Sequence, residues 1–465
     1  MPKINEVTLK PVLLFRAWLL KSLVETIEDI IGAPYSKFSS ATSRLTEALK
    51  ADGFIKSWYT ADFLPDEPRF MMMGARYGDL VNNSDAGFTK MSIASGPCGA
   101  DFYDYDKAAM RCLGEAVERT CLSFYQNKDL IFGSFKELQD RGAINPNSFV
   151  SFSDSQLKEE KFELCRFGED SRFGWVKGES LINGKNILVP AQLVYLSYTR
   201  NHREEPMIRR AISTGGAAHR SMEEALYRGV CEVIERDSWM IFWLNKLSPP
   251  VIDLENAPIG KIRKLSKLFK RYNLELYVLD FKTDIGIPTF CTLIIDRTGI
   301  GPAVVVANKT DLDSERALLG SVAEALKSWW GRKRRMRQAT GLQERGFLWS
   351  TPDMIPRADF LTKGPKVEFQ ISASPKESKK KLGVALEYFK KNNMEVAAVD
   401  ITIPEAKWHG FYSTMVLIPG LQPMYLNEDF PYLGGNRLYQ VPVKLGYFQK
   451  PKLEAELNQI THPHV

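Results

Sequence analysis

Two segments of this chain share one pattern, in which two glutamates three residues apart are followed directly by an arginine and lie among apolar residues. The first pair is Glu115 and Glu118, and the second pair is Glu232 and Glu235. Side chains three residues apart on a helix lie on one face and can reach a common point. Burying four carboxylates among apolar residues is costly unless cations neutralise them. The pattern therefore favours a fold in which two helices bring these carboxylates to a charge-compensated site.

Clustered oxygen ligands without His or Cys favour Mg2+, which typically binds a few protein carboxylates together with nucleotide phosphates. We therefore interpret the repeated pattern as a metal–nucleotide site. The alternative is a structural ion-pair network, because a single copy of the pattern is usually a solvated helix face. The sequence contains no Walker A, G-x-G-x-x-G, G-x-S-x-G or kinase H-R-D motif. A nucleotide site here must be of a less common type.

Composition limits the class of protein. The chain has 465 residues, 44% of them hydrophobic and 25% charged, which is typical of a globular protein of about two to three structural units. A net charge of +6 is small for this length and does not indicate nucleic-acid binding. The six cysteines have no C-x-x-C spacing, so we expect neither disulfides nor zinc and predict a reducing cytoplasm. Charges interrupt the apolar residues 13–24, which indicates an amphipathic helix rather than a signal peptide or a membrane span.

The periodicity of apolar residues predicts alternating helices and strands, hence an α/β (α+β) fold. The first glutamate pair falls in a helix over residues 104–127, and the second in a helix over 221–244. A small-residue loop at 213–218 precedes the second helix and could bring backbone N–H groups close to phosphate. Further predicted helices are two within 9–50, one near 154–162, one from 312 and one at 382–391; predicted strands are 70–74, 187–191, 193–197, 274–280, 289–295, 303–307, 394–399 and 411–418.

The order of these pieces resembles the YcaO family. Residues 104–119 resemble its first motif, residues 213–237 its second and residues 315–328 its third. The resemblance implies a YcaO-type fold in which mixed β-sheets pack against helices that carry an ATP and Mg2+ site. It also implies three regions: a helical, partner-docking region at 1–80, the ATP-binding core at 81–345, and the rest of the fold with a Pro-containing tail at 346–465.

The resemblance also implies roles for individual residues. Glu115, Glu118, Glu232 and Glu235 would hold Mg2+. The residues expected at the ATP are Arg119, Ala217, Arg220, Glu224, Arg236, Glu324 and Lys327. Two positions depart from the family pattern: Lys327-Ser-Trp329 stands where Gln-Ser-Arg is usual, and His219 replaces a common glycine. A general base is still needed, and the candidates are His219, His462 and the terminal carboxylate of Val465.

The activity implied by the resemblance is ATP-dependent conversion of Cys, Ser or Thr in a ribosomally made precursor peptide to thiazoline or oxazoline. The segment before the first motif is short, so the chain looks like the stand-alone heterocyclase subunit of a thiazole/oxazole-modified microcin synthetase. Its expected partners are the precursor peptide, a leader-binding protein related to ubiquitin-activating (E1-like) enzymes and a flavin-dependent dehydrogenase, with no nucleic acid and no membrane. The competing hypotheses are another amide activation, giving a thioamide or macroamidine, and a non-catalytic scaffold subunit.

Overall fold

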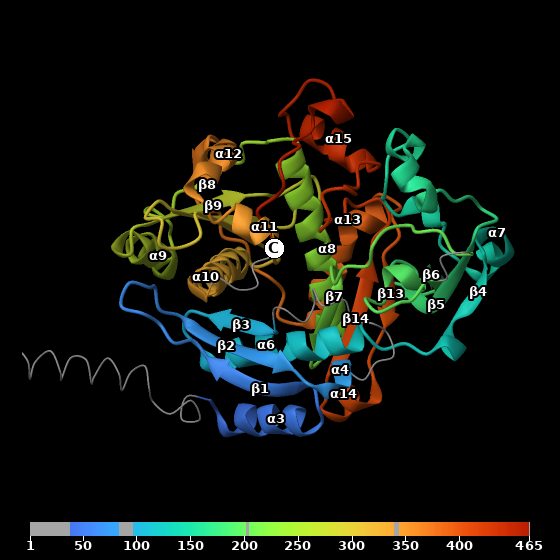
Figure 1. Ribbon diagram of the computed structural model, residues 1–465, viewed down its shortest axis with the longest axis horizontal. Coiled ribbons are helices and arrows are strands. Elements are labelled where there is room, and N and C mark those ends of the chain that lie inside the picture. Colours follow the sequence, from blue (N-terminus) through green and yellow to red (C-terminus); the bar gives the residue numbers. More distant parts are fainter. Residues whose placement is uncertain (1–37, 83–95, 201–203, 339–343, 465) are drawn as a thin grey trace, which may run out of the picture.

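The computed structural model describes residues 38–82, 96–200, 204–338 and 344–464 (Figure 1). Residues 1–37, which include the predicted helix over residues 13–24, and Val465 lie outside the described residues. Three β-sheets surround a central helix, α8 (Met222–Leu244), which runs through the middle of the molecule in Figure 1. The expected α/β fold of mixed sheets and helices is confirmed.

The first sheet carries the first glutamate helix. Its strands are β1 (Ile55–Thr60), β2 (Met71–Tyr77) and β3 (Cys98–Asp101), paired antiparallel in that order. Helix α6 (Tyr105–Cys121) begins where the Asp104 side chain accepts a hydrogen bond from the Lys107 backbone N–H, as expected of an N-cap. A Cβ on Gly99 would lie 2.0 Å from the Ala108 carbonyl oxygen, so only glycine allows β3 to approach α6 this closely.

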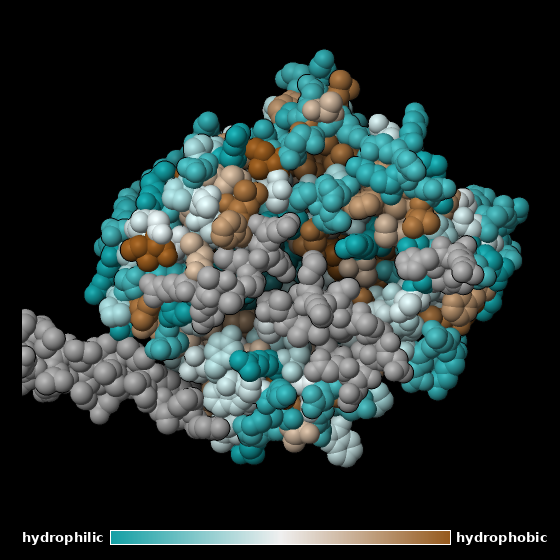
Figure 2. All heavy atoms as spheres, in the orientation of Figure 1, coloured by the Kyte–Doolittle hydropathy of each residue, from teal (hydrophilic) through white to brown (hydrophobic). Residues whose placement is uncertain are grey.

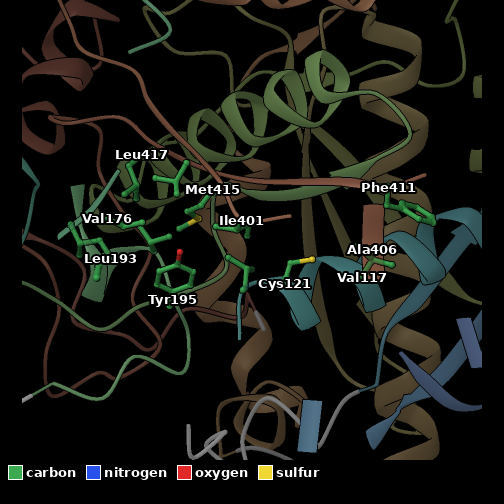
Figure 3. Close-up of a cluster of buried hydrophobic side chains, with 14 of the residues drawn as sticks. Val117, Cys121, Val176, Leu193, Tyr195, Ile401, Ala406, Phe411, Met415 and Leu417 are labelled. Atoms are coloured by element: carbon green, nitrogen blue, oxygen red, sulfur yellow. The ribbon is translucent and has the colours of Figure 1, made fainter. Parts of the chain in front are cut away.

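The second sheet joins strands from distant parts of the sequence. Its order is β4 (Ile131–Ser134), β5 (Arg172–Ser180), β13 (Ala397–Asp400), β14 (Tyr412–Leu417) and β7 (Gly216–His219), and β6 (Asn186–Pro190) pairs with β5. Figure 3 shows the core under this sheet, where Val117 and Cys121 of α6 lie in one buried cluster with Met415 and Leu417 of β14. This shared core positions α6 beside β7.

The third sheet supports the third motif. Its order is β11 (Val304–Thr310), β10 (Thr289–Asp296), β9 (Leu274–Asp280), β8 (Val251–Ile252) and β12 (Lys366–Val367), with β12 parallel to β8 and the other pairs antiparallel. Helices α9 (Gly260–Arg271) and α10 (Ser314–Gln338) share a buried cluster with alternate residues of β11, such as Val305 and Ala307. The other alternate residues, such as Val306, pack with Trp239 and Trp243 of α8. Strand β11 therefore lies between α10 and α8.

The other helices, together with short 3-10 turns, lie around the three sheets and α8. They are α3 (Ser40–Ala51), α4 (Asp79–Asn82), α7 (Phe135–Leu138), α11 (Glu344–Leu348), α12 (Ile355–Ala358), α13 (Ser378–Lys391), α14 (Pro404–Trp408) and α15 (Asn436–Lys444). None of the described helices is long and apolar enough to cross a membrane.

Three local predictions were wrong. Residues 193–197 do not form a strand: β6 ends at Pro190, which has no N–H to continue a ladder, and a 3-10 turn over Ala191–Leu193 follows. The helix expected near 154–162 is a pair of 3-10 turns, Gln156–Lys158 and Glu160–Cys165. The loop expected at 213–218 is strand from Gly216 onward, because β14 offers it an antiparallel partner.

Candidate active site

A cavity of about 3400 Å³ lies between α6, α8, α10 and β11. This volume is several times that of a typical small-molecule pocket, about 300–1,000 Å³, so a nucleotide and a peptide segment could both fit. Its lining has roughly twice as many Lys and Arg as Asp and Glu, which suits an anionic ligand. A hollow is visible near the centre of the face drawn in Figure 2.

Helix α6 presents the first glutamate pair to this cavity. Arg119 lies 3.7 Å from a Glu115 carboxylate oxygen and 3.5 Å from one of Glu118. Glu115 also accepts a 3.0 Å hydrogen bond from the Cys98 backbone N–H, which ties its carboxylate to the start of β3. All three charged side chains line the cavity. The arginine that completes the motif therefore neutralises the glutamates of its own helix.

Helix α8 repeats the arrangement on the opposite wall. Arg236 donates a 2.8 Å hydrogen bond to Glu235 and lies 3.4 Å from Glu232. The second oxygen of Glu235 accepts from the Thr310 backbone N–H at 3.0 Å, which fixes it to the end of β11. Arg236 also lies 3.0 Å from Nε2 of His464 in the C-terminal tail.

The carboxylates of the two helices act on one another. Burial raises the pKa of Glu118 well above its usual value, Arg119 opposes the shift, and the negative charges of Glu232 and Glu115 reinforce it. Burial likewise raises the pKa of Glu235, against the opposing influence of Arg236. The electrostatic influence of Glu232 on Glu118 means that α6 and α8 face each other across the site. The two arginines compensate this negative charge incompletely, which favours binding of a further cation.

Helix α10 brings the third motif to the same cavity. Lys327 donates a hydrogen bond to Glu324 and another, of 3.0 Å, to the Cys98 carbonyl oxygen. Burial would raise the pKa of Glu324, but the charge and hydrogen bond of Lys327, together with the charges of Lys309 and Arg111, outweigh it and the pKa falls. The lysine that departs from the family pattern thus neutralises a carboxylate at this wall.

The side chains that could hold a metal ion at this site are glutamates. In the described part of the chain, no three His, Cys, Asp or Glu side chains are placed together to hold a metal ion. Each glutamate pair lies against the arginine of its own helix. The donors are nevertheless all carboxylate oxygens, and Mg2+ typically needs only one or two of them beside waters and substrate phosphates. The residues fit Mg2+ that arrives with a nucleotide.

Comparison with known families decides the assignment. Residues 103–422 match the model of the YcaO cyclodehydratases, which is described as ATP- and Mg2+-binding. The chain belongs to the YcaO family. One relative is an uncharacterized protein of Methanothermobacter thermautotrophicus, 27% identical over 192 residues, which cover 41% of this chain and 46% of the relative. Another is an uncharacterized protein in the tfuA 3' region of Rhizobium leguminosarum bv. trifolii, 33% identical over 125 residues, which cover 26% of this chain and 29% of the relative. The chain spans less than half the length of either relative.

Solved structures share the fold. A heterocyclase in complex with substrate and cofactor superposes with a TM-score of 0.76 and 22% identity, covering 90% of this chain and 57% of that one. YcaO from Methanopyrus kandleri bound with AMPPCP and Mg2+ superposes with a TM-score of 0.60 and 17% identity, covering 83% of this chain and 91% of that one. A chain of the E. coli microcin synthetase McbBCD complex superposes with a TM-score of 0.56 and 13% identity, covering 78% of this chain and 87% of that one. These similarities establish the YcaO heterocyclase fold for this chain.

One residue expected at the ATP lies elsewhere. The Glu224 carboxylate, on α8, does not line the cavity; it is buried against Arg228 at 2.9 Å and Lys381 at 3.1 Å, and it also accepts from Ser378. Burial would raise the pKa of Glu224, but the two cations and the hydrogen bonds outweigh it and lower the pKa to about 2. Glu224 therefore supports Arg228, which does line the cavity.

This arrangement predicts an acid-sensitive contribution to stability. A carboxyl whose folded pKa is about 2, against a usual 4.5, stabilises the fold above about pH 4.5 and loses that contribution as the pH falls towards 2. In urea unfolding at a series of pH values, the free energy of unfolding should fall less over this range in Glu224→Gln than in the wild type. Glu387→Gln, an exposed carboxylate on α13, is the control. Equal pH dependence in wild type and Glu224→Gln would contradict the assigned ion pairs.

The remaining ATP candidates and the candidate base His219 line the cavity. Ala217 and His219 lie on β7, the edge strand of the second sheet. Arg220 follows them, donates a 2.9 Å hydrogen bond to the His409 carbonyl oxygen and lies over the Phe411 ring. Burial and the nearby Arg228 lower the pKa of His219, so its ring is neutral at pH 7 and able to accept a proton.

His462 is not brought to the cavity. Its ring is fully buried, contacts the Tyr425 carbonyl oxygen at 2.9 Å, and does not line the cavity. Burial lowers its pKa to about 3, which makes it a weak base. Of the candidate bases, His462 is therefore placed away from the cavity, because the tail packs its side chain into the core. His464, two residues on, does line the cavity.

Sequence reasoning missed two polar residues, Asn308 and Lys309. Both line the cavity at the end of β11, beyond the apolar run 303–307 that predicted the strand. Neither belongs to the three motifs. The available signal was their position directly after the buried apolar run 303–307, inside the same strand, where polar side chains are disfavoured unless they serve a site.

Proposed function

We propose that this protein is an ATP-dependent cyclodehydratase that converts Cys, Ser or Thr of a ribosomally made precursor peptide to thiazoline or oxazoline. The observation that supports this most is the convergence of glutamates from α6, α8 and α10 on one large basic cavity. The family assignment supports ATP and Mg2+ as its ligands. The similarity to heterocyclases supports a peptide substrate.

The proposed reaction balances without an oxidant. The substrate thiol or hydroxyl attacks the carbonyl carbon of the preceding amide and loses its proton to a base. The former carbonyl oxygen takes the γ-phosphoryl group of ATP, leaving ADP. That oxygen then departs as phosphate while the amide nitrogen loses its proton, and a C=N bond forms within the ring that the attack had closed. The peptide loses the elements of one water, which ATP hydrolysis formally consumes.

The residues have separate tasks in this proposal. Glu115, Glu118, Glu232 and Glu235 would hold Mg2+, which supplies positive charge to the phosphate oxygens. Arg119 and Arg236 orient these carboxylates, since each already bonds to the glutamates of its own helix. His219 is the candidate base that lines the cavity as a neutral ring. The volume beyond the carboxylates would admit the peptide.

We also propose that the protein works with partners in the cytoplasm. The related fold of the McbBCD complex supports a multi-subunit synthetase. A leader-binding E1-like protein would deliver the precursor, and a flavin-dependent dehydrogenase would oxidise azolines to azoles. All six cysteines are free thiols, which suits a reducing compartment.

Mass spectrometry tests this function. With precursor peptide, leader-binding partner, ATP and Mg2+, we expect the peptide to lose the mass of one water for each ring formed. ADP and phosphate should accumulate in equal amounts. Replacement of the carbonyl oxygen by sulfur or nitrogen, after addition of sulfide or a peptide amine, would instead indicate thioamide or macroamidine formation. ATP left unconsumed under all these conditions would contradict the proposal and favour a scaffold subunit.

A further inference from the structure

Lys309 occupies a defined position at the end of β11. Successive side chains of a strand point to opposite faces, so Lys309 shares the face of Val305 and Ala307, which pack against α10. A Cβ on Gly320 of α10 would lie 3.1 Å from Cγ of Lys309, so the lysine stem runs closely over that glycine. The side chain lines the cavity, and the adjacent Thr310 N–H is bonded to Glu235.

Carboxylates from all three motif helices surround this lysine. Its positive charge acts on Glu118 of α6 and Glu235 of α8, where it opposes the rise in pKa that burial causes, and on Glu324 of α10, where it adds to the lowering of the pKa. The same three side chains line the cavity with it. Lys309 therefore acts electrostatically on one carboxylate of each motif helix.

Lys309 nevertheless has no bonded partner. Arg119, Arg236 and Lys327 each make an ion pair with a glutamate of their own helix. Within the described ranges, the Lys309 side chain makes neither an ion pair nor a hydrogen bond. A partly buried ammonium without a partner gains free energy when an anion binds beside it.

We propose that Lys309 binds the β- and γ-phosphate oxygens of the nucleotide, between the carboxylates of α6, α8 and α10. The proposal rests on the proposed function, because the anion is the nucleotide of that reaction. Since Lys309 lines the cavity with the carboxylates proposed to hold Mg2+, it would lie at the phosphate end of the nucleotide. A compact ammonium suits this task, since it meets phosphate as a point charge.

Nucleotide titration tests the assignment. Calorimetry with AMPPCP and Mg2+ should give binding to Lys309→Met that is weaker than to the wild type by about tenfold or more, as expected for loss of a hydrogen bond to a charged group. Binding of AMP, which lacks the β- and γ-phosphates, should not change. Lys309→Arg should retain part of the AMPPCP affinity. Lys261→Met is the matched control: it removes a cavity lysine that already lies 3.8 Å from Glu315.

A second variant covers a failure of Lys309→Met to fold. Gly320→Ala introduces the methyl group 3.1 Å from the lysine stem and must displace it, while alanine favours the helix. It should fold and bind AMPPCP several-fold more weakly, with AMP unaffected. Wild-type affinity for AMPPCP in either folded variant would overturn the role of Lys309 and leave the proposed function standing. Absence of AMPPCP binding in the wild type would overturn both.

Discussion

Replacing Glu118 by glutamine is expected to lower ATP-dependent peptide turnover by about a hundredfold or more, without loss of stability. The carboxylate would no longer supply charge to Mg2+ at the transferring phosphoryl group, and removal of a preorganised electrostatic contact typically has an effect of this size. The fold should tolerate the change, because burial and neighbouring glutamates already raise the pKa of Glu118. A carboxyl with a raised folded pKa destabilises the protein progressively as the pH rises above its usual value of 4.5, so an uncharged amide in its place should not lower stability at pH 7. Steady-state kinetics and urea unfolding at pH 7 measure the two effects.

A loss of turnover without a loss of stability would show that Glu118 acts in the reaction rather than in holding the fold. Glu235→Gln should behave in the same way, since its pKa is also raised. Glu223→Gln is the control, because Glu223 is exposed at the start of α8 and lies outside the cavity lining. Glu118→Gln could instead lower stability while the molecules that remain folded keep full activity. The glutamate pairs would then be structural ion pairs, the alternative left open by the sequence.

The second large effect concerns Arg437 on α15. Its guanidinium donates to Asp237 at 2.8 Å and to Asp284 at 2.8 Å, and Asp237 is fully buried. Removing one partner of a buried ion pair typically costs about 3–5 kcal/mol, because the other charge stays buried without compensation. We expect Arg437→Met to lower the free energy of unfolding by that amount, measured by urea denaturation. Asp237 directly follows Arg236, so the variant should also weaken nucleotide binding.

Lys444→Met is the matched control for this prediction. Lys444 lies on the same helix, 3.3 Å from the same Asp284, but its side chain is 60% exposed. Exposed pairs typically contribute about 0–1 kcal/mol, so this variant should remain close to the wild type. A similar small effect of Arg437→Met would show that water or another cation compensates Asp237.

Local signals explain what the sequence predicted well. Helices α6 and α8 follow capping residues, Asp104 and Ser221, and their glutamate pairs recur at helical spacing. The strand predicted over 274–280 coincides with β9, whose Leu274–Asp280 run ends where polar residues resume. Such signals lie within a few residues of one another. They fixed which helices carry the carboxylates and predicted that these side chains meet.

Long-range contacts explain which features of the site could not be predicted from the sequence. Glu224 binds Lys381, which is 157 residues away, and no local pattern links the two. His462 was a candidate base by residue type, yet tail packing buries it. Lys309 lies outside every motif, and only the pairing of β11 with β10 and its packing on α10 bring it to the glutamates. Tertiary packing thus decides which charged residues reach the cavity.

Isothermal titration of AMPPCP with Mg2+ into the wild type and Glu232→Gln is the most direct test of the nucleotide site. Glu232 lines the cavity, pairs with Arg236 and acts electrostatically on Glu118 across it. We predict saturable binding to the wild type and at least about tenfold weaker binding to the variant, in keeping with loss of one charged contact. Equal affinity in the two proteins would contradict a metal–nucleotide site built from the paired glutamates.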